Sequence, residues 1–131
     1  MARIYDPPID ITIVNSITGT VTTTTTGASM AVPSETWESA IVFLTCGTWV
    51  DGTHTLTITE SVLGTTFTAA GTAARGALPA AITGTAGASQ TYQVKYYGTG
   101  NYLKVLDTVV SGTTGMGLAA FAVLTGRKYS P

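Results

Sequence analysis

Residues 37–46, which read WESAIVFLTC, decide the fold class of this chain. One set of alternate positions holds Trp37, Ser39, Ile41, Phe43 and Thr45, and the other holds Glu38, Ala40, Val42, Leu44 and Cys46. Successive side chains of a β-strand point to opposite faces of the sheet, so both faces of this segment would be largely apolar. The pattern predicts a central strand that is buried on both sides.

The composition of the whole chain also favours β-structure. The 131 residues include 27 Thr and 15 Gly, and only 10% are charged, where about 25% is usual. Thr is β-branched and suits a pleated, half-buried surface. A long amphipathic helix needs a charged outer face, and no segment supplies one. Helices are therefore expected to be single turns at most.

Short alternating segments continue along the chain and are separated by turn signals. The Gly-containing turns are expected at residues 51–52, 64–66, 98–101 and 111–115, and we expect the first of them to close a hairpin. This spacing predicts a single antiparallel β-sandwich or small barrel-like domain of about seven or eight strands. The expected core anchors are Trp37, Ile41, Phe43, Tyr96 and Val105.

The chain is expected to have three parts. Residues 1–33 are interpreted as an extended arm or edge strand that includes a low-complexity tract, Thr22–Thr26. Residues 34–126 form the sandwich, and residues 127–131 form a tail. Within the sandwich, residues 69–91 are rich in Ala, Gly and Thr, which predicts a long contact loop. The expected partner contacts are Ile9, Ile11, Ile13, Pro79, Arg127, Lys128 and Tyr129.

The residues that usually perform catalysis or hold metals are scarce. The chain has one His, His54, and one Cys, Cys46, whereas a zinc site needs three or four such ligands. Gly98–Gly100 has no third Gly in register and leads into a predicted strand, and Gly112–Gly115 lacks the Lys of a P-loop, so neither has the context of a phosphate-binding loop. We therefore expect no catalytic residue, no metal, no cofactor and no enzymatic activity.

The charge pattern also argues against two classes of partner. The six basic residues are scattered, and the formal net charge is −1. Binding to nucleic acid or to an anionic membrane surface needs clustered Lys and Arg. The N-terminus shows no apolar run typical of a signal peptide, so we expect synthesis in a reducing cytosol. An alternative function is a carbohydrate- or cell-surface-binding module, in which Trp49 and Tyr97 would stack on sugars.

Four segments together resemble a family of small virion structural proteins of tailed bacteriophages. They are Gly47–Ser61 with its D-G-T-H motif, Phe67-Thr68, Tyr92–Val105 with its Y-x-V-x-Y pattern, and Thr125–Lys128 with its basic ending. The match covers about residues 40–128, and the N-terminal Thr tract departs from the family pattern.

The resemblance implies a head decoration, or cement, protein. Such a protein would bind the major capsid protein on the outside of the shell, as a homotrimer or other homo-oligomer, after assembly in the cytoplasm of the bacterial host. A neck, tail or fibre-adaptor component of the same particle is the alternative within this class.

Overall fold

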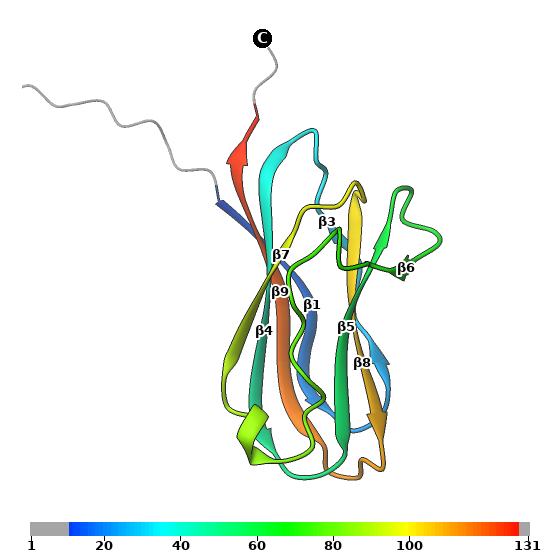
Figure 1. Ribbon diagram of the computed structural model, residues 1–131, viewed down its shortest axis with the longest axis vertical. Helices are drawn as coiled ribbons and strands as arrows, with labels where there is room; N and C mark the ends of the chain where they lie inside the picture. The colour runs from blue at the N-terminus through cyan, green and yellow to red at the C-terminus, as the bar shows by residue number, and fades with distance from the viewer. Residues whose placement is uncertain (1–10, 129–131) are drawn as a thin grey trace, which may run out of the picture.

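Two facing antiparallel sheets form the domain within residues 11–128, the part of the chain that the computed structural model describes (Figure 1). The first sheet has the order β1 (Ile11–Val21), β9 (Met116–Arg127), β4 (Trp37–Trp49) and β7 (Thr91–Tyr96). The second has the order β2 (Thr25–Thr26), β8 (Tyr102–Val110), β5 (Thr53–Ser61) and β6 (Thr68–Ala69), with β3 (Met30–Ala31) also paired to β8. The predicted all-β sandwich is confirmed.

Helical structure is limited to one short element in these residues. It is a 3-10 turn, η1 (Thr85–Gly87), which precedes β7 in the chain. No helix within residues 11–128 is long and apolar enough to cross a membrane.

The core lies between the inner faces of the two sheets. From the first sheet, β4 contributes Ala40, Val42, Leu44 and Cys46, and β9 contributes Leu118, Ala120, Ala122 and Leu124. From the second sheet, β5 contributes Leu56 and Ile58, and β8 contributes Leu103 and Val105. All of these side chains are buried, so removal of apolar surface from water stabilises the packing of one sheet on the other.

Most connections between strands cross from one sheet to the other. β4 belongs to the first sheet and β5 to the second, so the hairpin predicted at residues 51–52 is wrong. The connections from β7 to β8 and from β8 to β9 also change sheets, whereas β5 and β6 do pair. A Gly with positive φ, such as Gly52 at +87°, marks a chain reversal. The reversal leaves open whether the second strand pairs beside the first or packs across the core from it.

The N-terminal segment is part of the sandwich as far back as the structure describes it. β1 pairs with β9 along its length, with one register shift between Asn15 and Ile17, and it places Ile17 and Val21 in the core. β2 lies in the Thr-rich tract and forms the edge of the second sheet beside β8. The expected boundary between arm and sandwich at residue 33 therefore does not separate two structural units, and the first ten residues of the expected arm lie outside the described part.

The C-terminal boundary also differs from the expected one. β9 continues to Arg127, where it pairs with Trp37, so the expected tail begins inside a strand. The last three residues of that tail lie outside the described residues.

β4 is central in its sheet, but only one of its faces is covered. β9 and β7 flank it, and the second sheet packs on its Val42–Leu44 side. Ile41 and Phe43 lie on the opposite, outer face and are half-buried, so the prediction of burial on both sides is wrong. The rings of Phe43 and Phe121 stack there, with centroids 5.3 Å apart and an interplanar angle of 7°. An apolar alternation indicates which positions share a face, but it does not indicate whether another layer covers that face.

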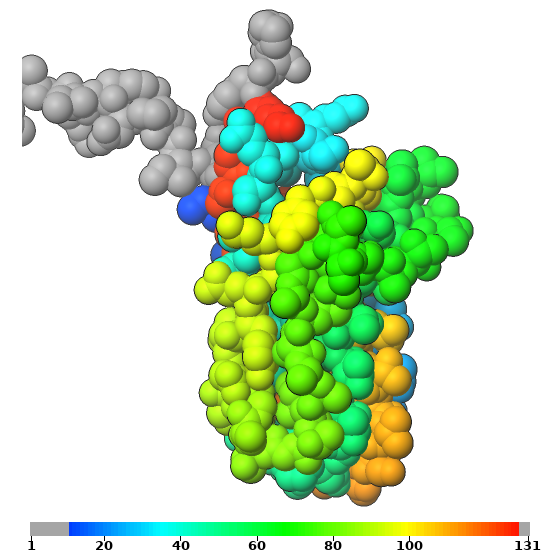
Figure 2. Space-filling view, viewed as in Figure 1, coloured from blue at the N-terminus to red at the C-terminus, as the bar shows by residue number. Residues whose placement is uncertain are grey.

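The long segment after β6 closes one open side of the sandwich. It runs between the β5 edge and the β7 edge, and Figure 2 shows it covering this side of the molecule. His54 and Ile82 exchange backbone hydrogen bonds of 2.9 and 2.8 Å, and Gly76 N–H donates to the Lys95 carbonyl at 2.8 Å. Ala70, Ile82 and Ala88 are buried in the core. The segment that was expected to be a contact loop thus has a structural role, and its contact role stays a prediction.

Leu44→Ala and Ile41→Ala test the assignment of the two faces of β4. Leu44 is fully buried, so its truncation should cost about 3 kcal/mol of unfolding free energy through lost burial and a cavity. Ile41 is only half-buried, so its truncation should cost about 1 kcal/mol. Urea unfolding followed by circular dichroism measures both. A larger loss for Ile41→Ala would mean that the faces are reversed.

Candidate functional site

The D-G-T-H motif ties two turns together at one end of the sandwich. The Asp51 carboxylate accepts hydrogen bonds from the backbone N–H groups of Thr113 (2.9 Å), Thr114 (3.0 Å) and Gly115 (2.7 Å). These donors hold the pKa of Asp51 below its usual range, because they stabilise the charged form. Val50 N–H also donates to the Gly115 carbonyl at 3.0 Å. The β4–β5 and β8–β9 connections are therefore joined, and we call this end the clamped end.

His54, the last residue of the motif, belongs to a buried polar pair. Its Nδ1 lies 2.8 Å from Asp107 Oδ2, and its Nε2 lies 3.2 Å from the backbone oxygen of Asp51. A carbonyl oxygen only accepts, so Nε2 carries a proton. Both side chains are 0% exposed, and burial raises the pKa of Asp107. The pair links β5 to β8 inside the core, where a substrate in solvent does not reach it.

Cys46, the candidate nucleophile, is also enclosed. Cys46 is buried on β4, and burial, with a smaller contribution from the charge of Asp107, raises the pKa of its thiol to about 11. The thiolate is the reactive form, so this Cys stays a neutral thiol at physiological pH. Within the described residues, no group of three or more His, Cys, Asp or Glu side chains could hold a metal ion.

The opposite end of the sandwich is formed by loops, and we call it the loop end. It brings together residues 33–36, 62–67 and 97–101, and the described chain begins at Ile11 and ends at Lys128 on the same side of the molecule (Figure 1). Three hollows of about 200, 220 and 310 Å³ lie among these loops. A cluster of loops on a rigid sheet scaffold is a common place for binding.

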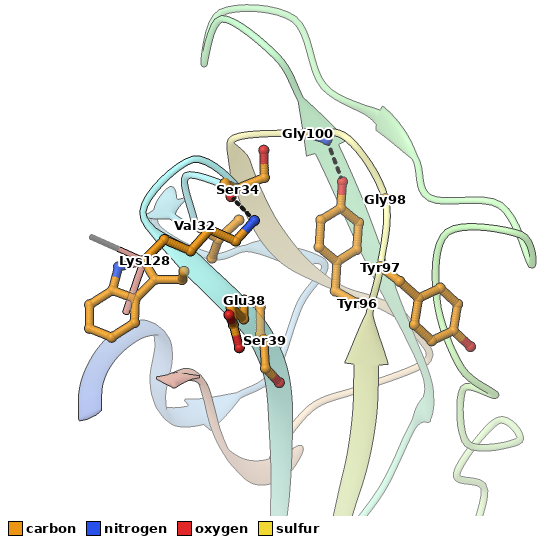
Figure 3. Close-up of a pocket in the computed structure, with 11 residues that line it drawn as sticks. Val32, Ser34, Glu38, Ser39, Tyr96, Tyr97, Gly98, Gly100 and Lys128 are labelled. Atoms are coloured by element: carbon orange, nitrogen blue, oxygen red, sulfur yellow. Dashed lines mark hydrogen bonds between the residues drawn. The ribbon is translucent and has the colours of Figure 1, made fainter. Parts of the chain in front are cut away.

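The 200 Å³ hollow lies between the start of β4 and the end of β7 (Figure 3). Tyr96 forms one wall, and its hydroxyl donates to Glu60 Oε2 at 2.6 Å and accepts from Gly100 N–H at 2.7 Å. Burial and the bond to Glu60 raise the pKa of this phenol well above its usual value. Lys128 Nζ donates to the Ser34 carbonyl at 3.0 Å across the opposite wall. These three hydrogen bonds hold the loops in place, so the walls of the hollow are preformed.

An exposed apolar pair at the loop end was missed by sequence reasoning. Leu63 is 79% exposed and Val62 is 57% exposed in the turn between β5 and β6, a segment that stands out from the body in Figure 2. A Val-Leu pair placed directly before the turn residues Gly64–Thr66 was the available signal, because turns usually carry polar side chains. Exposed large apolar side chains outside the core point to an interaction surface when they cluster.

The residues predicted as partner contacts fall in different places. Ile11 and Ile13 are exposed on β1, and Arg127 and Lys128 lie at the end of β9. Pro79 is half-buried in the segment that closes the side of the sandwich. Ile9 and Tyr129 lie outside the described residues.

Only some of the residues predicted as core anchors lie in the core. Val105 and Tyr96 are buried between the sheets. Ile41 and Phe43 lie on the outer face of the first sheet, and Trp37, at its end, is half-buried. The inner positions of β4 are instead taken by the neighbouring residues Val42 and Leu44.

Trp49 and Tyr97 do not form one stacking platform for a sugar. Trp49 lies at the clamped end, where its indole N–H donates to the Gly52 carbonyl at 2.8 Å. Tyr97 follows Tyr96, which pairs with Ala40 at the opposite end of β4, so the two aromatic residues are about 30 Å apart.

Comparisons with known proteins show similarity at the level of the fold. No family model matches the chain, and no curated protein matches its sequence. Among solved structures, it is similar to the crystal structure of the SPBc2 prophage-derived protein YomS, with a TM-score of 0.54 and 12% sequence identity. The similarity covers 95% of this chain and 100% of that chain.

Asp51→Asn tests the clamp between the two turns. The pKa of Asp51 is lowered in the folded state, so its stabilisation is full above about pH 4 and is lost as the pH falls through the folded pKa. We expect the variant to melt at a lower temperature than the wild type at pH 7, and the gap to narrow in acid. Glu38→Gln, which neutralises an exposed carboxylate at the loop end, is the control. A gap that widens in acid would contradict this role.

A double-mutant cycle tests the buried pair. His54→Ala leaves the Asp107 carboxyl unpaired in the core and should cost about 3–5 kcal/mol of unfolding free energy. The apolar variants His54→Phe and Asp107→Leu should each be destabilised, and the double variant should lose less than the sum of the two. Urea unfolding at pH 7 measures each corner of the cycle. Additive losses would show that the two side chains are not coupled.

Proposed function

We propose that this chain is a non-enzymatic structural protein of a bacteriophage particle, and that it decorates the outer surface of the head. Its fold similarity to a prophage-derived protein supports a phage origin. The resemblance of residues 40–128 to small tailed-phage virion proteins supports the decoration role. Its partner would be the major capsid protein, and its binding would stabilise contacts between neighbouring capsid subunits.

The observation that carries the proposal is the exposed apolar turn at the loop end. Leu63 and Val62 project from a rigid sandwich, and both line the hollow of about 310 Å³, while Val62 also lines the hollow of about 220 Å³. An exposed apolar patch surrounded by polar residues marks an interaction site. By contrast, His54 and Cys46, the residues best suited to catalysis, are enclosed in the core.

The low charge of the chain supports apolar attachment over ion pairing. Only 13 of its 131 residues are charged at neutral pH, six basic and seven acidic. Salt screens interactions between exposed charges but has little effect on burial of apolar surface. Attachment to the shell should therefore change little between low and high salt.

Leu63→Asp tests this attachment. Purified protein is mixed with heads of the phage that encodes it, prepared without this protein, and binding is measured by co-sedimentation. We expect the variant to bind about tenfold more weakly or worse, because a carboxylate replaces the apolar anchor. Val110→Asp is the matched control, since Val110 is 60% exposed at the clamped end.

Two outcomes would overturn the proposal. Equal binding of the Leu63→Asp variant and the wild type would show that the loop end does not contact the capsid. Labelling confined to one vertex, in images of particles that carry tagged protein, would favour the neck or tail role over decoration of the whole shell.

A further inference from the structure

The outer face of the first sheet has a continuous apolar stripe. One row of the stripe crosses three strands. It starts at Ile13 on the edge strand β1, which pairs with Val123 on β9, and Val123 pairs with Ile41 on β4. In the adjacent row, Phe121 pairs with Phe43, and their rings are stacked. Ile13 is 59% exposed and Ile11 is 54% exposed at the end of this stripe.

No other layer of the described chain covers this face. The second sheet packs on the opposite side, and the segment after β6 closes the β5–β7 side (Figure 1). The outer face carries Ile, Val, Phe and Ala at its centre, and Asn, Gln and Thr around them. Lys95, on β7, pairs with Ile41 at the margin of the stripe.

The size of the face suits a stable interface. The strands of this sheet have 11, 12, 13 and 6 residues, which gives a mean length of about 35 Å at the usual rise per residue. Four strands are about 19 Å wide, so the face measures about 650 Å². Two such faces in contact would bury about 1,300 Å², above the roughly 1,000 Å² expected of a specific interface.

We propose that this outer face packs against the same face of a second copy of the chain. A two-fold interface brings the same surface of both copies together, which disfavours a face rich in one charge and favours a face whose centre is uncharged. Sheets pack face to face at about 10 Å in an aligned orientation, as the two sheets already do inside this domain. A partner that binds through charged groups would find no charged side chain at the centre of the stripe.

The dimer is independent of attachment to a phage head, because it concerns the isolated protein and a different surface from the loop end. Sedimentation equilibrium of the full chain at micromolar to submillimolar concentration should show a dimer in exchange with monomer. Ile41→Lys should shift the protein to monomer, because it places an ammonium in the middle of the buried stripe. Val110→Lys, on the second sheet, should dimerise as the wild type does.

Ile13→Lys provides a second variant, since the fold tolerates a lysine best at a side chain that is already mostly in solvent. It should weaken the dimer at least tenfold while circular dichroism and melting temperature stay close to those of the wild type. An alternative dimer in which two β1 edges pair would not be disrupted by Ile41→Lys, because Ile41 lies on a central strand. A monomeric or trimeric wild type, or a dimer that persists in both lysine variants, would overturn the proposal.

Discussion

The inner faces of β4 and β9 have to be covered by a second sheet, and the rest of the domain is organised around that requirement. The covered side chains alternate with outward ones along both strands, as the period of a pleated strand demands. Most connections cross between the sheets, so most strands of one sheet are followed in the chain by a strand of the other sheet. β1, β2 and β3 complete the edges, and the segment of residues 70–90 closes the gap beside β5 and β7.

The two ends of the sandwich are built differently: polar contacts join the turns at one end, and apolar side chains are exposed at the other. At the clamped end, the Asp51 carboxylate satisfies three backbone donors of another turn, and the His54–Asp107 pair lies directly beneath it. A buried pair of this kind is costly to break once formed, so it favours a single arrangement of these strands. At the loop end, hydrogen bonds such as that from Tyr96 to Glu60 hold the loops, while Val62 and Leu63 remain in solvent.

The D-G-T-H motif shows why a recognisable pattern need not be a reactive site. Three of its residues have structural roles, because Asp51 binds a neighbouring turn, Gly52 adopts a positive φ, and His54 pairs with a buried carboxylate. A His next to an Asp is also how a catalytic base is oriented, but here both groups are enclosed. Access to solvent, which depends on the packing of both sheets, decides between the two roles.

The sequence by itself determined the fold class, the central strand at residues 37–46 and the scarcity of His and Cys. Alternation in residues 37–46, Gly-containing turns and a low charge content are local properties, and local properties survive in any arrangement of the strands. The tertiary structure decided which strands pair, which face of β4 lies inside and where the N-terminal strand belongs. Those outcomes depend on contacts between residues far apart in the chain: Val42 is inside and Ile41 outside because the second sheet packs on one side only. For the same reason, only the folded arrangement shows that Leu63 is exposed at the end of the domain and that Ile13, Val123 and Ile41 form one stripe.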